Sequence, residues 1–267
     1  MRAWIAGAAA LCERDMRIFF SYRTRFLTIG FTPIVGVTLF YYVSRLVNSP
    51  QVGSSDDYFG YVVVGTVILQ VLTATLTTPL GTMRSELLVG TFERLVVAPF
   101  GPVASVLSLT IFPVFLGLAV ALLTLSYAAI VFGVSIEWPM ALAGLPVAAL
   151  GAISFAPFGI LMAGIALTVK QATAGAAIVV AALSLVAGIY FPPSLLPDWI
   201  SWLSDVQPFT PATELLRHLL LGTPMSGTVQ GAILELIAFA VVMLPAATFV
   251  LRASVTHSRR NGTITEY

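Results

Sequence analysis

Long apolar runs alternate with short clusters of charged residues along the whole chain. Several of the uncharged runs reach about 20 residues, the length that an α-helix needs to cross a bilayer. The charge gaps and the turn residues between them predict six spans, which we place by number at 26–46, 58–82, 103–133, 138–168, 172–191 and 230–251. The pattern therefore predicts an all-α polytopic membrane protein with a six-span domain over residues 26–251.

The composition strengthens this prediction and removes several classes of function. Of 267 residues, 58% are hydrophobic and 9% are charged, against roughly 25% charged residues in soluble domains. A net charge of +1 is too small for the concentrated basic surface that nucleic-acid binding requires. A single cysteine, Cys12, excludes a disulfide within the chain and a multi-cysteine metal site.

Motifs for catalysis are missing from the sequence. The only lysine, Lys170, does not follow a glycine-rich phosphate-binding loop, and the two histidines, His218 and His257, lack zinc-protease spacing. No serine-hydrolase elbow occurs. We therefore predict no catalytic residue, no metal site and no cofactor in this chain.

The distribution of basic residues predicts the orientation of the spans. With the N-terminus in the cytoplasm, eleven of the 13 Lys and Arg residues fall on the cytoplasmic side and only Arg45 and Arg217 fall outside. This asymmetry follows the positive-inside rule. Both termini are predicted to be cytoplasmic, with an N-terminal segment over residues 1–25 and a tail over 252–267.

An amphipathic helix is predicted before the first span. Its apolar face is formed by residues at spacings of four and three, namely Ile5, Ala9, Cys12, Met16 and Phe19. Such a helix lies in the membrane surface. The alternative is a simple charged flank that stops transfer of the first span, which leaves the apolar face unexplained.

The segment 84–102 is predicted to be a short cytoplasmic helix that begins where the second span ends. Glu86 and Glu93 stand seven residues apart on one helical face with apolar residues between them, and Pro99 and Pro102 end the helix.

The loop 192–229 on the outer side opens with an apolar stretch. It contains Pro192, Pro193, Trp199 and Trp202, and a second stretch over 212–221 reads as another short helix. We expect a re-entrant helical pair that dips into the outer leaflet.

The second span carries a polar stripe at spacings of four, three and four: Thr66, Gln70, Thr73 and Thr77. Two interpretations stay open. The stripe lines a translocation path or a dimer seam, or its hydroxyl groups bond to their own helix while Gln70 pairs with a neighbouring span. Glu235, inside the last span, is expected to pair with Arg217 or to face outer water.

These features together resemble the type-2 family of ABC exporter permeases, which is similar to the membrane halves of ABC-G transporters. The most specific parts are Glu86-x-x-x-Gly-Thr-Phe-Glu-Arg-Leu before Ala98-Pro99, and the loop from Phe191-Pro192 through Trp202 to Pro211. The first resembles the family's coupling helix, the second its outer re-entrant pair, and the amphipathic N-terminus its elbow helix.

The resemblance implies a homodimer in which each chain docks on a separate ATP-binding cassette ATPase that binds ATP and magnesium. It implies export of an amphiphilic substrate, such as a drug, a lipid or a lipid-linked glycan, across a bacterial or archaeal plasma membrane. The residues that match the coupling segment are Glu86, Gly90, Thr91, Glu93 and Arg94.

Two other functions stay open on the sequence alone. An ion-coupled secondary transporter usually carries ionisable residues near the bilayer centre and an internal repeat, and neither is evident here. A membrane assembly or scaffold subunit that transports nothing is not excluded by the composition alone.

Overall fold

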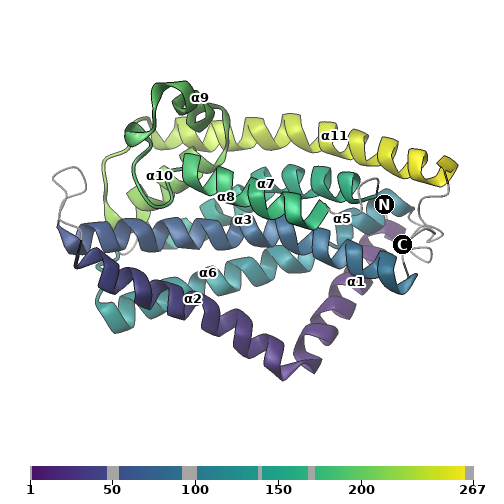
Figure 1. Cartoon of the computed structure of the whole chain (residues 1–267), viewed down its shortest axis with the longest axis horizontal. Coiled ribbons are helices and arrows are strands. Elements are labelled where there is room, and N and C mark those ends of the chain that lie inside the picture. Colours follow the sequence, from purple (N-terminus) through teal and green to yellow (C-terminus); the bar gives the residue numbers. More distant parts are fainter. Residues whose placement is uncertain (1, 47–53, 92–100, 138–139, 168–171, 262–267) are drawn as a thin grey trace.

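The protein is a bundle of helices (Figure 1). The computed structural model describes residues 2–46, 54–91, 101–137, 140–167 and 172–261, and all regular elements within these ranges are helical. In chain order they are α1 (Arg2–Ser21), α2 (Arg23–Ser44), α3 (Ser55–Val89), α5 (Pro102–Ser108), α6 (Ile111–Phe132), η1 (Met140–Ala143), α7 (Gly144–Ala166), α8 (Ala172–Val186), η2 (Pro193–Leu195), α9 (Asp198–Val206), α10 (Phe209–Leu221) and α11 (Val229–Asn261).

Five stretches in the described ranges are long and apolar enough to cross a membrane: Leu27–Ser44, Ser55–Val89, Val103–Phe132, Met140–Ala166 and Val229–Ser258. They coincide with five of the six predicted spans. The remaining one, predicted at 172–191, corresponds to α8, which has only 15 residues. A full crossing by this segment, and with it the six-span arrangement, stays a prediction.

Helix α3 lies at the centre of the bundle and packs against α6, α7, α8 and α10. In the most apolar stretch of α3, 72% of the residues are buried. The corresponding share is 11% in α2 and 17% in α11. The central position explains why β-branched and leucine residues cover most faces of α3, since the buried faces of a helix are apolar.

One contact between α3 and α7 is unusually close. Pro79 has no backbone N–H, so the Thr75 carbonyl four residues earlier lacks its usual helical donor. Gly159 of α7 packs against that carbonyl oxygen, and a methyl group at Gly159 would overlap it. The glycine therefore allows the two backbones to approach at the level where the α3 ladder is interrupted.

The predicted separation of the second span from the following cytoplasmic helix is wrong. Helix α3 continues without a break through Arg84 and Glu86 and ends at Val89, with Gly90 as its C-cap at φ 75°. A left-handed C-cap is a common glycine position. Glu86 therefore lies near the end of α3, whereas Glu93 lies within residues 92–100, outside the described part of the chain, so their common helical face stays a prediction.

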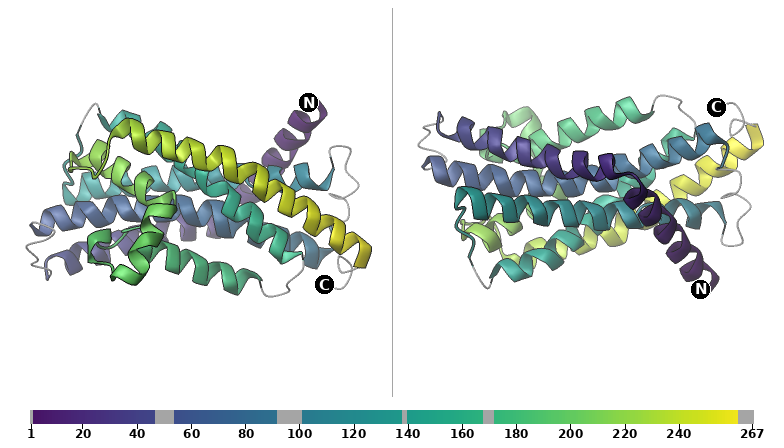
Figure 2. Two further views of the ribbon diagram at one scale, coloured as in Figure 1. Left: turned by 90° about the horizontal axis from the view of Figure 1, so that it is seen from above. Right: turned by 90° about the horizontal axis from the view of Figure 1, so that it is seen from below.

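The N-terminal helix α1 stands at a steep angle to α2, and its first residues project to the side of the bundle (Figure 2). Phe19 of its expected apolar face is buried and meets Phe112 of α6 at 5.7 Å between ring centroids. Ile5 and Met16 of that face are exposed. The described ends of α1 and α11 lie at the same end of the bundle (Figure 1), as expected for termini on one side of a membrane.

The outer loop contains the two expected short helices, α9 and α10. Helix α10 is inside the bundle, where Phe209 is fully buried against Phe155 of α7 at 4.3 Å between ring centroids. Helix α9 lies beside it with its tryptophans exposed. Their depth in a bilayer stays a prediction.

Candidate functional site

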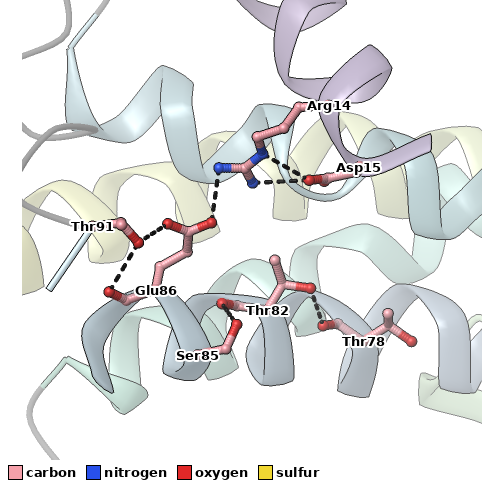
Figure 3. A network of polar contacts seen from close by, with 7 residues as sticks. All are labelled: Arg14, Asp15, Thr78, Thr82, Ser85, Glu86 and Thr91. Carbon is pink, nitrogen blue, oxygen red and sulfur yellow. Dashed lines mark hydrogen bonds and ion pairs between the residues drawn. The ribbon is translucent and has the colours of Figure 1, made fainter. Parts of the chain in front are cut away.

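An ionic cluster joins α1 to the last turns of α3 (Figure 3). Arg14 Nη1 lies 2.8 Å from Glu86 Oε1, and its Nε and Nη2 donate to Asp15 Oδ1 at 3.0 and 2.8 Å. The side chains of Asp15 and Glu86 are only 13% and 11% exposed, and that of Arg14 is 34% exposed. The cluster is thus shielded from water and ties two distant parts of the sequence together.

Glu86 also holds the chain that leaves α3. Its second carboxylate oxygen accepts a hydrogen bond from the Thr91 hydroxyl, and the Thr91 backbone N–H donates to the Glu86 carbonyl at 3.0 Å. The structure therefore brings together Glu86, Gly90 and Thr91 of the expected coupling residues. Glu93 and Arg94 lie outside the described residues.

The charge on Arg14 is secured by its neighbours. Burial lowers the pKa of the guanidinium, but the hydrogen bonds and charges of Asp15 and Glu86 outweigh this, so that its pKa stays above the ordinary arginine value. Arg14 therefore keeps its positive charge throughout the physiological pH range.

Three of the four polar stripe residues face one cavity. Thr66, Gln70 and Thr73 line a space of about 580 Å³ between α2, α3 and α6, whereas Thr77 is not part of its wall. The described lining contains no Asp, Glu, Lys, Arg or His. Tyr190, which stacks on Phe40 at 5.6 Å between ring centroids, also lines it. Volume and lining are typical of a site for a mainly apolar ligand.

The same stripe residues make the local bonds that the second interpretation expects. Thr66, Thr73 and Thr77 donate their hydroxyl hydrogens to carbonyls of α3 itself at 2.7–2.8 Å. Gln70 Nε2 donates to Thr124 Oγ1 of α6 at 2.9 Å. The hydroxyl hydrogens of Thr66 and Thr73 are thus used inside α3, and what these side chains offer the cavity is acceptor oxygens.

The predicted outer-loop residues lie in two places. Pro192 and Pro193 form the turn after α8 that opens η2. Trp199 and Trp202 lie on α9 and are 75% and 57% exposed, and Trp202 Nε1 donates to the Trp199 carbonyl at 3.0 Å. The two tryptophans therefore present their rings away from the protein core.

The sequence did not reveal the role of Arg217, which is 4% exposed on α10. Its Nη2 donates to the carbonyls of Gly188 and Ile189 at 2.8 and 3.1 Å, and its Nε and Nη2 both reach the Tyr61 carbonyl at 3.2 Å. The guanidinium thus satisfies carbonyls at the end of α8 and joins that end to α3. The sequence signal was a basic residue on the outer side of the predicted topology, where only Arg45 is a second one.

Of the two alternatives for Glu235, the pair with Arg217 is wrong, because Arg217 makes the carbonyl contacts above and Glu235 is exposed on α11; that it faces outer water stays a prediction. The acidic residue nearer in sequence, Glu214, accepts a hydrogen bond from the Ser226 hydroxyl at 2.6 Å.

Comparison with known proteins agrees with this arrangement. A comparison with curated proteins gave no significant match. A family model described as ABC-2 type transporter matches residues 8–221, a stretch that includes the ionic cluster, the cavity and α10. Because the match covers well over half of the 267 residues, the chain belongs to the ABC-2 type transporter family.

Proposed function

We propose that this chain, the membrane-spanning permease subunit of an ABC transporter, exports an amphiphilic substrate in an ATP-driven cycle. The proposed substrates are a drug, a lipid or a lipid-linked glycan, taken from the cytoplasm or the inner leaflet. The observation that carries the proposal is the cavity beside α3, whose described wall combines apolar side chains with hydroxyl and amide groups and holds no charged residue. Such a wall accepts an apolar body together with a few hydrogen-bonding groups.

The energy is proposed to come from a separate ATPase subunit that binds ATP and magnesium. Two copies of this chain are expected to form the permease of a bacterial or archaeal plasma membrane, with both termini in the cytoplasm. The proposed contact with the ATPase is the segment that follows α3, with Glu86, Gly90, Thr91, Glu93 and Arg94. The cluster of Arg14 and Glu86 supports this choice, since it joins the start of that segment to α1 and so to the first span.

A matched pair of variants tests whether the cavity carries substrate. In vesicles that contain the permease and its cognate ATPase, Gln70→Leu removes an amide from the cavity wall and its bond to Thr124. Thr124→Val removes the same bond from the other side, at a residue that is not part of the described wall. We expect Gln70→Leu to reduce ATP-dependent transport of a fluorescent amphiphile by about tenfold, the effect of one lost polar interaction, and Thr124→Val to reduce it much less. Equal losses would assign Gln70 to helix packing alone.

A second experiment tests the contact with the ATPase. The variant Glu93→Ala is first checked for normal membrane insertion and dimerisation. Its association with the ATPase and its transport activity are then measured together. We expect both to fall. Unchanged association with unchanged transport would make the segment after α3 a simple connector.

A further inference from the structure

Three neighbouring cavities lie along α6, between this helix and α1, α2 and α3. One of about 440 Å³ lies beside the ionic cluster, one is the 580 Å³ cavity of the polar stripe, and one of about 330 Å³ lies between α2 and α6. Leu116 of α6 lines all three, and Phe19 lines the first and the third. The three cavities therefore adjoin at Leu116, and we refer to them together as the recess.

The chemistry of the recess changes along its length. The 440 Å³ cavity has Arg14, Asp15, Ser85 and Glu86 on one wall and Phe112 with Leu116 on another. The 330 Å³ cavity has only apolar residues in its described lining. A charged end followed by an apolar end matches a molecule with a polar head and a hydrocarbon tail.

The charged end has hydrogen-bonding capacity to spare. Within the described residues, Arg14 uses three of its five N–H groups on Asp15 and Glu86. A guanidinium with two further N–H groups can donate to a phosphate oxygen, while the neighbouring Glu86 carboxylate suits a cationic group a few ångströms away. The same carboxylate opposes a head with net negative charge.

We propose that this recess binds a zwitterionic amphiphile from the adjacent membrane leaflet, with its phosphate at Arg14, its ammonium at Glu86 and its tail along α2 and α6. The leaflet is the cytoplasmic one in the orientation predicted from the basic residues. This inference deepens the proposed function and rests on it for the statement that the amphiphile is cargo. Binding itself does not depend on the ATPase.

Lipid photocrosslinking tests the site on the intact permease. The protein is placed in vesicles of equimolar phosphatidylethanolamine and phosphatidylglycerol, with a photoreactive diazirine in the tail of one lipid at a time, and adducts are mapped by mass spectrometry. At Leu116 and its cavity neighbour Val120 we expect about fivefold more adduct with phosphatidylethanolamine, a preference typical of one partly shielded ionic contact. At Leu122, which is exposed on the same helix and outside the recess, we expect equal labelling. Equal labelling at Leu116, a preference for phosphatidylglycerol, or no adduct there would overturn the proposal.

Two pairs of variants separate binding from folding. Leu116→Trp fills the junction of the cavities and should abolish the preferred adducts, whereas Leu122→Trp, facing away from the recess, should leave them unchanged. Arg14→Gln should make the adduct yields of the two lipids equal. Arg17 pairs with the exposed Glu13, and Arg17→Gln should leave the preference unchanged. Each variant is accepted only if its size-exclusion profile matches the parent. A preference that survives both Leu116→Trp and Arg14→Gln would contradict the assigned site.

The outcome is distinguishable from failure of the proposed function. If the recess binds no lipid selectively while ATP-dependent transport proceeds, the site is wrong and the permease function stands. If the lipid binds but no ATPase is stimulated, the export function is wrong and the binding site stands.

Discussion

The guanidinium carbon of Arg217 in α10 lies 3.3 Å from the centroid of the Tyr61 ring in α3. The Tyr61 hydroxyl donates to the Gly188 carbonyl at 2.8 Å, the same carbonyl that Arg217 reaches. These two side chains therefore close a triangle among α3, α10 and the end of α8. A buried cation held by carbonyls and a ring, rather than by a carboxylate, gives the outer part of the bundle a fixed geometry.

Arg217→Met should destabilise the protein by about 3 kcal/mol or more, because several buried carbonyls lose their donor at once. Tyr61→Phe removes one hydrogen bond and should cost about 1 kcal/mol. Arg252→Gln, at an exposed site on α11, should have almost no effect. Thermal unfolding of the purified proteins in detergent checks this order; a variant at Arg217 as stable as the parent would show that the triangle contributes nothing.

Gly159→Ala should loosen the contact between α3 and α7, since the added methyl group meets the Thr75 carbonyl, which is backbone and cannot rotate away. A loss of about 1–3 kcal/mol is expected from overpacking. The control is Gly36→Ala in α2, where no atom lies within 4 Å of the new methyl group and the change should be neutral or stabilising. The unfolding midpoint of each variant is measured beside that of the parent protein. We expect a clear decrease for Gly159→Ala and no change or a small increase for Gly36→Ala.

Arg14 and Glu86 should show measurable coupling in a double-mutant cycle. From Arg14→Gln, Glu86→Gln and the double variant we expect an interaction of about 1 kcal/mol, because the pair is mostly shielded. The exposed pair of Arg17 and Glu13, treated in the same way, should give less than about 0.5 kcal/mol. The interaction energy is obtained from the unfolding free energies of the parent, the two single variants and the double variant. Stimulation of the ATPase by each variant then tells whether the link is also needed for coupling.

Cys12 should react slowly with iodoacetamide at neutral pH. Burial raises the pKa of its thiol, and the nearby Asp15 carboxylate raises it further, so less of the reactive thiolate is present at a given pH. The rate should therefore rise with pH around a midpoint above the ordinary thiol value. A pH series on the native protein, with urea-unfolded protein as the control, measures the midpoint; a value equal to or below that of the unfolded chain would contradict the expectation.

The sequence predicted the elements that depend on local pattern and missed those that depend on distant contacts. Charge gaps placed five spans correctly because a charged residue inside a bilayer is costly wherever the chain goes. The predicted end of the second span is too early, although the sequence carries the signal: no proline or glycine occurs between Gly81 and Gly90, and Gly90 is a typical C-cap. Arg84, at the predicted boundary, lies within the helix.

The candidate sites divide in the same way. The spacing of Thr66, Gln70 and Thr73 was enough to place them on one wall, because that face belongs to a single helix. Nothing in the sequence connects Arg14 with Glu86, which are brought together by the turn from α1 to α2 and by the packing of α3. The environment of Arg217 was equally hidden, since its acceptors are backbone groups at Tyr61, Gly188 and Ile189 and carry no residue signature.

The close contact of Thr75 with Gly159 also determines how α3 is able to move. The contact divides the helix into an N-terminal arm of about 30 Å, from Ser55, and a C-terminal arm of about 21 Å, to Val89. The backbone bond that Pro79 removes belongs to the same carbonyl, so the hydrogen-bond ladder of α3 lacks one bond at the point of contact. A tilt of α3 as one rod would turn about Gly159, because the backbones of α3 and α7 meet there. A displacement at Glu86, about 16 Å from Thr75, would then be reversed in direction and enlarged about 1.8 times at Ser55, about 30 Å from Thr75.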